Sequence, residues 1–254
     1  MLLRPLSWYN KLSEPKARKT EHLFLLEGFR GVEQMLNNHP HSVDELLITE
    51  KYQWLAQEYR VPHRILLPQQ IKKFCTSVTP REVIAVVKIP ENSCSSVMPV
   101  DPGDRVLFLD GVQDPGNVGT LIRTAAALNY SGCILTSKCA DPFSPKSVQS
   151  TAGALLGLWI RRTHDYSTLL WEFKNRGYKI VSAAVEGAKA IDFAEYPRHI
   201  LALGSEGTGL TQNVVALSDQ VFQIPIDAKA VESLNVAACG AICMFMASNK
   251  LRIS

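Results

Sequence analysis

The stretch Ile224–Phe245, IPIDAKAVESLNVAACGAICMF, is the part of the chain that decides the fold. It starts with a rigid Ile-Pro at the end of an expected strand, crosses a short polar loop and continues as a helix of small apolar residues. Ser233 or Asn235 is well placed to cap that helix. A loop that leads into a helix N-terminus offers unpaired backbone N–H groups, which can hold a carboxylate, a phosphate or the polar edge of a cofactor. Because such caps are also common as plain architecture, the stretch alone leaves both interpretations open.

The composition is that of a globular protein. The 254-residue chain has 46% hydrophobic and 20% charged residues, enough for one large domain or two small ones. No segment approaches the roughly 18 consecutive apolar residues of a membrane span, and the N-terminus lacks the apolar core of a signal peptide. We therefore expect a cytoplasmic protein without membrane contact. The six cysteines form no CxxC pair and lie mostly in apolar runs, so we expect buried reduced thiols and no metal site.

The first 20 residues carry a local excess of positive charge. Against the single acidic residue Glu14 stand five basic ones: Arg4, Lys11, Lys16, Arg18 and Lys19. We interpret residues 1–20 as a basic N-terminal arm, which either contacts nucleic acid or is a solvated terminus. Trp8 and Tyr9 either stack on a base or, as the commoner use of such side chains, pack against the neighbouring domain.

The hydrophobic pattern divides the rest of the chain into two α/β domains. Over residues 21–90, short apolar runs alternate with amphipathic segments, which predicts a small α/β domain. Residues 91–103 break every periodicity and contain prolines and serines, so we expect a linker. Over residues 104–254, continuous apolar strands alternate with helices, which predicts a parallel sheet buried on both faces. Ligands of such sheets bind in loops at the carboxyl ends of the strands.

Two further strand ends carry chemistry. LDGVQDPGNVGTLIRTAAAL, residues 109–128, predicts a turn, a helix capped by Asn117, and Arg123 near the start of that helix. HILALGSEGTGL, residues 199–210, ends a strand in a glycine-rich loop that carries Glu206 and allows a ligand to approach the backbone. Arg123 is either an ordinary exposed, ion-paired residue or a site residue with Glu206 as its partner.

Three ordered motifs carry a family resemblance. NVGTLIRTAAAL, LALGSEGTGL and IPIDAKAVESLNVAA resemble the sequence motifs of the SpoU/TrmH family of S-adenosylmethionine-dependent RNA ribose methyltransferases. The segment KTEHLFLLEGFRGVEQML resembles, more loosely, the start of the ribosomal-protein-like substrate-binding domain found in many members. The resemblance implies a catalytic domain with a deep C-terminal trefoil knot over residues 104–254, and a homodimer.

The resemblance also implies a reaction, the transfer of a methyl group from S-adenosylmethionine to a ribose 2′-hydroxyl of RNA. Ribosomal RNA is favoured over transfer RNA by analogy with members that have this first domain. A non-catalytic RNA-binding or ribosome-assembly protein with the same fold is the alternative from another class. The retained polar motif residues argue against that alternative.

The family motifs assign roles to individual positions of this chain. The residues expected to contact the cofactor are Leu203, Gly204, Ile224, Pro225 and Leu234. The residues expected in the polar catalytic site are Asn117, Arg123, Glu206, Ser233 and Asn235. The residues expected to bind RNA are Lys11, Lys16, Arg18, Lys19 and Arg123.

Arg123 holds the position of the family's proposed base. A guanidinium is effectively always protonated in proteins, so we favour electrostatic activation of the hydroxyl and phosphate clamping over proton abstraction. The chain departs from the family between Asp227 and Val231, where a glycine-free loop is one residue longer than usual. We expect this loop to be stiffer, with the cofactor contacts of Ile224 and Leu234 on either side of it.

Overall fold

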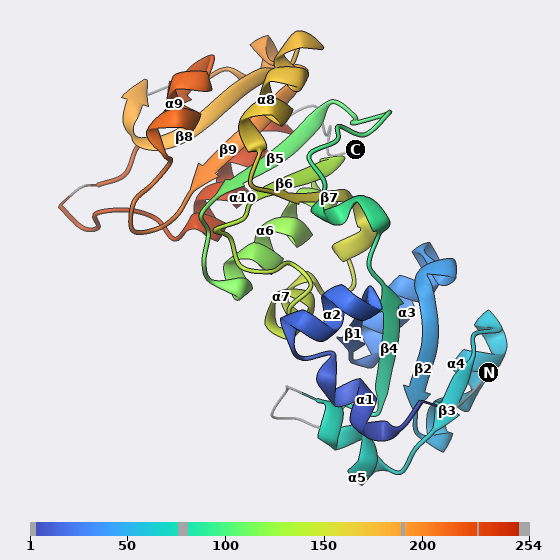
Figure 1. The fold of residues 1–254 in the computed structure, drawn as a ribbon. Coiled ribbons are helices and arrows are strands. Elements are labelled where there is room, and N and C mark those ends of the chain that lie inside the picture. The colour runs from blue at the N-terminus through green and yellow to red at the C-terminus, as the bar shows by residue number, and fades with distance from the viewer. Residues whose placement is uncertain (1–3, 76–80, 189–190, 228, 249–254) are drawn as a thin grey trace, which may run out of the picture. The chain divides into compact units, whose positions relative to one another are not determined.

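The computed structural model describes residues 4–75, 81–188, 191–227 and 229–248. The chain divides into two compact units, Met1–Glu91 with Asp141–Gly157, and Asn92–Ala140 with Leu158–Ser254 (Figure 1). The segment 141–157 packs with the first unit, whereas we expected it inside a continuous second domain. No helix among the described residues is long and apolar enough to cross a membrane.

The first unit contains the alternation of strands and helices predicted for residues 21–90. Its elements there are β1 (Leu23–Glu27), α3 (Phe29–Asn38), β2 (Val43–Ile48), α4 (Gln53–Tyr59), β3 (His63–Ile65), α5 (Pro68–Ile71) and β4 (Val83–Lys88). The strand order is β1-β4-β2-β3, with β4 antiparallel to both of its neighbours and β2 parallel to β3. The sequence of β4, VIAVVK, is rich in β-branched residues and buried at its first five positions, which suits a central strand.

The predicted N-terminal arm is wrong in form, because two short helices there belong to the core of the first unit. These are α1 (Leu6–Lys11) and α2 (Pro15–Glu21). Tyr9 and Leu12 are almost completely buried and pack in one cluster with Ile84 and Val86 of β4. The Tyr9 hydroxyl donates a hydrogen bond to Glu45 at 2.5 Å. Packing, not base stacking, is therefore the use of Tyr9.

Arg18 is also a structural residue, which corrects its expected role in RNA binding. Its side chain is only 3% exposed and forms an ion pair with Asp141 at 2.6 Å. The same guanidinium donates to the carbonyl oxygens of Leu12 at 3.1 Å and Ser13 at 2.6 Å. Both terminal nitrogens of the guanidinium are thus used inside the first unit, where they join α2 to the segment 141–157.

That segment contains one short α-helix among its described residues. Helix α7 (Pro145–Thr151) ends where Ala152 adopts the left-handed conformation with a φ of 50°. Ser144 caps its start by accepting a hydrogen bond from the N–H of Ser147. Phe143, just before the helix, lies against Phe24 of β1 with ring centroids 5.6 Å apart.

The second unit contains a six-stranded parallel sheet with helices on both faces. Its elements are β5 (Arg105–Asp110), α6 (Pro115–Ala127), β6 (Gly132–Thr136), β7 (Trp159–Thr163), α8 (Tyr166–Asn175), β8 (Lys179–Ala188), β9 (His199–Gly204), α9 (Gln212–Leu217), β10 (Gln220–Phe222) and α10 (Val236–Ala247). The strand order is β10-β8-β9-β5-β6-β7, and every paired strand runs parallel to its neighbour. The fold class expected from the apolar strands is therefore confirmed.

The two faces of this sheet are covered by different helices (Figure 1). Phe173 of α8 and Val214 of α9 pack with Phe108 and Ala202 on one face. Because side chains alternate along a strand, Leu203 points to the other face, where α6 and α10 lie. A Cβ at Gly240 of α10 would overlap the side chains of Leu121 and Leu203, so glycine permits this close packing.

The predicted linker is ordered and belongs to the second unit. Met98 is 6% exposed and lies in the core beside α8. The Trp159 indole donates to the carbonyl oxygen of Pro102 at 3.1 Å, and Arg161 donates to that of Val97 at 2.9 Å. Residues with little periodicity of their own are therefore fixed by side chains of β7.

The buried Arg18–Asp141 pair gives a test of the first unit. We expect Asp141→Asn to lower the free energy of unfolding by about 3 kcal/mol, because it leaves a buried guanidinium without its counter-charge. Glu82→Gln is the matched control, since Glu82 pairs with Lys51 at 3.5 Å and both side chains are exposed. It should cost less than about 1 kcal/mol in chemical denaturation. Equal losses in the two variants would contradict the assigned role of Arg18.

Candidate cofactor-binding and catalytic site

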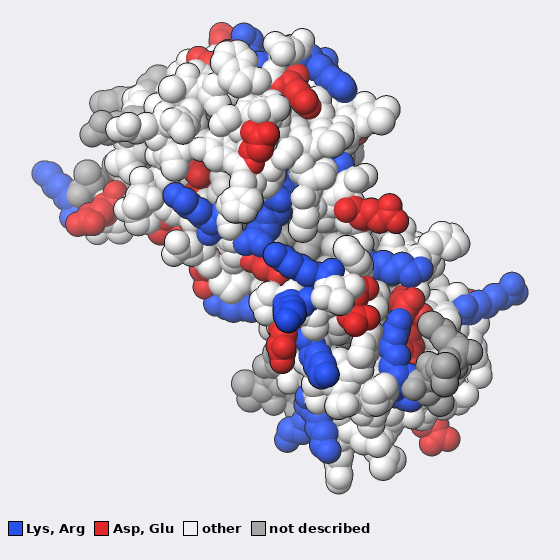
Figure 2. Space-filling model, viewed as in Figure 1, with Lys and Arg blue, Asp and Glu red and all other residues white. Residues whose placement is uncertain are grey.

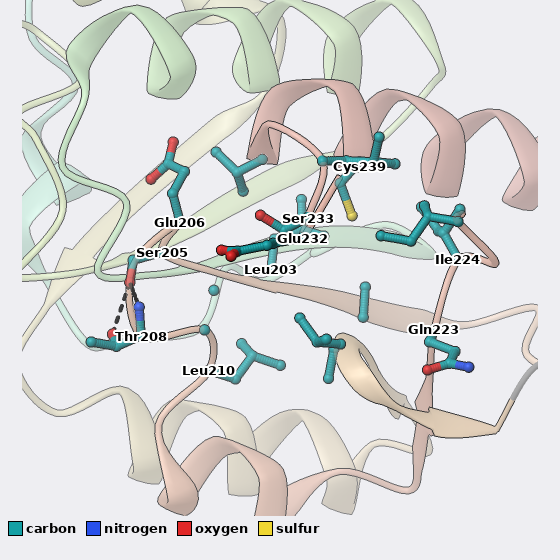
Figure 3. A pocket seen from close by; sticks show the side chains of 18 of the residues that line it. Leu203, Ser205, Glu206, Thr208, Leu210, Gln223, Ile224, Glu232, Ser233 and Cys239 are labelled. Carbon is teal, nitrogen blue, oxygen red and sulfur yellow. Dashed lines mark hydrogen bonds between the residues drawn. The ribbon is translucent and has the colours of Figure 1, made fainter. Parts of the chain in front are cut away.

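A cavity of about 700 Å³ opens in the second unit at the carboxyl ends of β8, β9 and β10 (Figure 3). Its walls come from three loops, residues 204–210, 223–226 and 232–234, together with the end of β8 and the start of α10. Parallel α/β sheets bind ligands at this edge. The volume suits a nucleoside-sized molecule.

The structure brings all five expected cofactor contacts to the wall of this cavity. Leu203 and Gly204 end β9, Ile224 and Pro225 follow β10, and Leu234 precedes α10. Strands β10 and β9 are each paired to β8, which lies between them in the sheet. The order of the strands therefore places Leu203, Ile224 and Leu234, which are up to 31 positions apart in the sequence, around one cavity.

The glycine-rich loop after β9 folds back on its own start. A Cβ at Gly204 would overlap the backbone of Gly209 and Leu210, so only glycine allows the turn. The N–H of Gly209 donates to the carbonyl of Ser205 at 2.9 Å, and the reverse hydrogen bond is 3.2 Å. The hydroxyls of Ser205 and Thr208 are 2.8 Å apart, which closes the loop at its tip.

Asp110, which the sequence analysis did not single out, fixes the base of this loop. Its side chain ends β5, is 3% exposed, and accepts a hydrogen bond from the N–H of Thr211 at 2.8 Å. An acidic residue at the end of an otherwise apolar strand was the signal available in the sequence. A buried carboxylate at that position needs a donor, and the returning loop supplies one.

Three expected catalytic residues form one hydrogen-bonded network beside the cavity. The side-chain amide of Asn117 donates to the carboxylate of Glu206. Asn235 donates to the side-chain oxygen of Asn117 at 3.3 Å. The oxygen of Asn235 accepts from the N–H groups of Ala237 at 2.9 Å and Ala238 at 3.3 Å, so Asn235 is the N-cap of α10.

The expected cap of α6 is wrong, because Asp114 and not Asn117 holds that position. The Asp114 carboxylate accepts from the N–H of Asn117 at 2.9 Å, and Pro115 occupies the first helical position. This leaves the Asn117 side chain free for the network. Ser233 lines the cavity and does not cap α10.

The expected pairing of Arg123 with Glu206 is also wrong. Arg123 lies in the third turn of α6, not in its first turns, and its side chain is exposed. It forms no ion pair with any residue that the structure describes, while Glu206 accepts from Asn117. A charged guanidinium without a partner remains available to a ligand from outside the unit.

The unusual loop after Pro225 is organised by Asp227, while Ala228 lies outside the described residues. The Asp227 carboxylate accepts from the N–H of Lys229 at 3.0 Å. Its carbonyl oxygen accepts from the N–H groups of Ala230 at 2.9 Å and Val231 at 3.1 Å. An Asx turn thus shapes the start of this glycine-free loop.

Cys239 departs from the prediction that the cysteines are core thiols. It is partly exposed and lines the cavity, whereas Cys243 one turn later is fully buried. A hydrogen bond from Cys243 lowers the pKa of the Cys239 thiol, and the opposite effect, together with burial, raises the pKa of Cys243. Cys239 lies on the cavity wall because the first turn of α10 faces the cavity. The sequence pattern could not predict which side of that turn would do so.

The remaining expected RNA contacts lie in the first unit. Lys11, Lys16 and Lys19 are exposed on α1 and α2. Figure 2 shows basic side chains over the part of the first unit that α1 and α2 occupy in Figure 1, interspersed with acidic ones. Within the described ranges, no three His, Cys, Asp or Glu side chains gather as metal ligands.

A parallel α/β unit with a ligand cavity at its strand ends and a polar network beside it defines a cofactor-using enzyme domain. The family model of the SpoU rRNA methylases matches residues 104–245, and the chain belongs to this family. That match includes all three loops that line the cavity.

Relatives share both units. The chain is 29% identical over 239 residues to the 23S rRNA (guanosine(2553)-2′-O)-methyltransferase RlmP of Bacillus subtilis, with 93% of each chain covered. It is similar to the SpoU methyltransferase AviRb from Streptomyces viridochromogenes in complex with S-adenosylmethionine, with a TM-score of 0.84, 25% identity and 96% and 97% of the two chains covered. An S-adenosylmethionine-bound rRNA methyltransferase from Sinorhizobium meliloti has a TM-score of 0.82 and 25% identity, covering 99% of this chain and 97% of that one.

The two roles of Asn235 can be separated by mutation. We expect Asn235→Ala to lower the free energy of unfolding by about 1 kcal/mol through loss of the α10 cap. Asn235→Asp should stay within about 0.5 kcal/mol of the parent protein in chemical denaturation, because a carboxylate caps a helix equally well. Equal destabilisation by Asp and Ala would show that donation to Asn117, and not capping, stabilises this region.

Proposed function

We propose that this protein transfers a methyl group from S-adenosylmethionine to a ribose 2′-hydroxyl of large-subunit ribosomal RNA. The observation that carries the proposal is that two of the three family motifs line one cavity, while the Asn117–Glu206–Asn235 network joins the first motif to its edge. Family membership supports the reaction class, and the named activity of RlmP supports ribosomal RNA as the substrate. A non-catalytic binding protein would have no need to keep this network.

The cavity fits S-adenosylmethionine in size and chemistry. Its volume of about 700 Å³ and its many apolar lining residues suit an adenosine. Leu203, Gly204, Ile224 and Leu234 would hold the cofactor, largely through the backbone groups of their loops. When bound, the cofactor supplies a methyl group that its sulfonium has already made electrophilic. The protein therefore has to position the hydroxyl and to raise its nucleophilicity.

Arg123 is our candidate for that task. Its exposed guanidinium has no ion-pair partner among the described residues and offers hydrogen-bond donors but no acceptor. It would clamp a phosphate next to the target ribose and stabilise the charge that develops on the hydroxyl oxygen. We favour this electrostatic role over proton abstraction by the same side chain, because a guanidinium has no acceptor atom.

RNA would also contact the first unit through Lys11, Lys16 and Lys19. Their exposed ammonium groups suit phosphate contacts, which position the RNA and make affinity dependent on salt. An RNA substrate and six free cysteines agree with a cytoplasmic enzyme. Arg18 is left out of this set because its guanidinium is buried.

Helix α10 supports the expected homodimer. Its sequence, VAACGAICMFMA, carries no charged residue, and such a helix is normally buried on all sides. Yet Ala238, Ile242 and Phe245 are exposed on one face, and Phe245 is 61% exposed. A second copy of the chain would cover this face beside α6, the helix that carries Arg123.

The trefoil knot stays a prediction that rests on the family resemblance. The chain leaves the edge strand β10, passes the end of β8 and returns to pack α10 against α6 and β9. Such a return past other loops is what a knotted C-terminal segment requires. General rules of topology make a knot rare, so only the family resemblance suggests it.

The catalytic role of Arg123 is tested by a conservative variant. With labelled S-adenosylmethionine and unmodified 23S rRNA, we expect Arg123→Lys to lose methyl transfer by about 100-fold or more, because a point charge cannot replace the forked donors. Cofactor affinity should change by less than about twofold, since Arg123 does not line the cavity. Arg176→Lys, an exposed position on the same unit, is the control and should behave as the parent. Near-normal turnover of Arg123→Lys would remove Arg123 from the mechanism.

The homodimer is tested by placing a charge on α10. Light scattering should give the parent protein the mass of two chains, and Phe245→Asp the mass of one, because a carboxylate would be buried unpaired in the interface. Val100→Asp changes an almost fully exposed apolar residue elsewhere on the same unit and should leave the dimer intact. A monomeric parent protein would contradict the proposed interface.

A further inference from the structure

The charge on the cavity wall is of one sign. Among its described lining residues the only charged side chains are two carboxylates, Glu206 and Glu232, and no lysine, arginine or histidine is included. A phosphate-bearing nucleotide would meet repulsion there, whereas a cation would meet attraction. Glycine-loop backbone and apolar side chains form the rest of the wall.

The two carboxylates are not equivalent. Glu206 accepts a hydrogen bond from Asn117 and is held in the network that reaches Asn235. Glu232 has no hydrogen bond or ion pair with any residue in the described part of the chain. In Figure 3, Glu232 and Ser233 extend from the side of α10 toward the loop of Ser205 and Glu206. Glu232 is thus the carboxylate that remains free for a ligand.

The reaction removes one positive charge from the cofactor. In the proposed reaction the electron pair of the methyl–sulfur bond would stay on sulfur, the methyl group would bond to the ribose oxygen, and the hydroxyl proton would pass to solvent. S-adenosylmethionine carries a sulfonium, an ammonium and a carboxylate, while the product S-adenosylhomocysteine keeps only the last two. A carboxylate near the sulfur therefore attracts the cofactor but not the sulfur of the product.

We propose that Glu232 is a charge-selective residue that favours S-adenosylmethionine over S-adenosylhomocysteine and so promotes exchange of product for fresh cofactor. This inference rests on the proposed function of the same cavity. Glu232 acts in the discrimination between the two ligands and takes no part in the methyl-transfer step itself. Because Glu232 is exposed, its attraction is moderate and is screened by salt.

Calorimetric titration of the full chain with each of the two ligands tests the assignment. At low salt, Glu232→Gln should weaken S-adenosylmethionine binding by about fivefold and S-adenosylhomocysteine binding by less than about twofold. Glu232→Lys, which reverses the charge, should weaken S-adenosylmethionine by about 25-fold, the square of the first effect. The difference between the ligands should shrink at about 0.5 M salt.

Glu195→Gln is the matched control, because it removes the same charge. Glu195 is exposed in the same unit and does not line the cavity. This variant should leave both affinities unchanged. Equal weakening of the two ligands by Glu232→Gln would assign Glu232 to the shared ammonium group and overturn the proposal. Unchanged affinities in both Glu232 variants would overturn it as well. A parent protein that binds neither ligand would instead overturn the proposed function itself.

Discussion

One chain of side-chain hydrogen bonds, from Asn235 through Asn117 to Glu206, holds together three loops that are far apart in the sequence. Each loop follows a different strand of the parallel sheet. The network joins the start of α10, the start of α6 and the glycine-rich loop directly, in addition to the packing of α10 on α6. Asn235 also caps α10, so the same residue that stabilises the helix sets the position of the site.

Close backbone approaches make the network possible. Gly240 lets α10 lie against Leu121 and Leu203, and Gly204 lets the loop after β9 fold onto its own backbone. Larger residues at either position would push the loops apart, with loss of hydrogen bonds that depend on distances near 3 Å. The buried carboxylate of Asp110 then fixes the C-terminal end of the glycine-rich loop by accepting a hydrogen bond from the N–H of Thr211. Catalytic geometry in this unit is thus set by packing as much as by the polar residues themselves.

Apart from helices α1 and α2, local pattern was enough to predict the strands and helices of both units, because apolar periodicity can be seen over a few consecutive residues. The individual residues that line the cavity were predicted only through the family motifs. What sequence could not supply was long-range pairing. From the sequence, Arg18 was assigned to a basic arm. In the structure it forms an ion pair with Asp141, 123 residues away. Glu206 was a candidate partner for Arg123, but its carboxylate accepts a hydrogen bond from Asn117 instead. Neither pairing can be predicted from sequence spacing, because each depends on which distant segments the fold brings together.

We propose that the cavity and its network serve methylation of a ribose hydroxyl in large-subunit ribosomal RNA. The most direct measurement maps 2′-O-methyl groups in total RNA from cells with and without the gene. Our account predicts that one or a few ribose methyl groups in 23S rRNA disappear with the gene and return with the parent protein but not with its Arg123→Lys variant. Unchanged 23S rRNA, or a loss confined to transfer RNA, would contradict it.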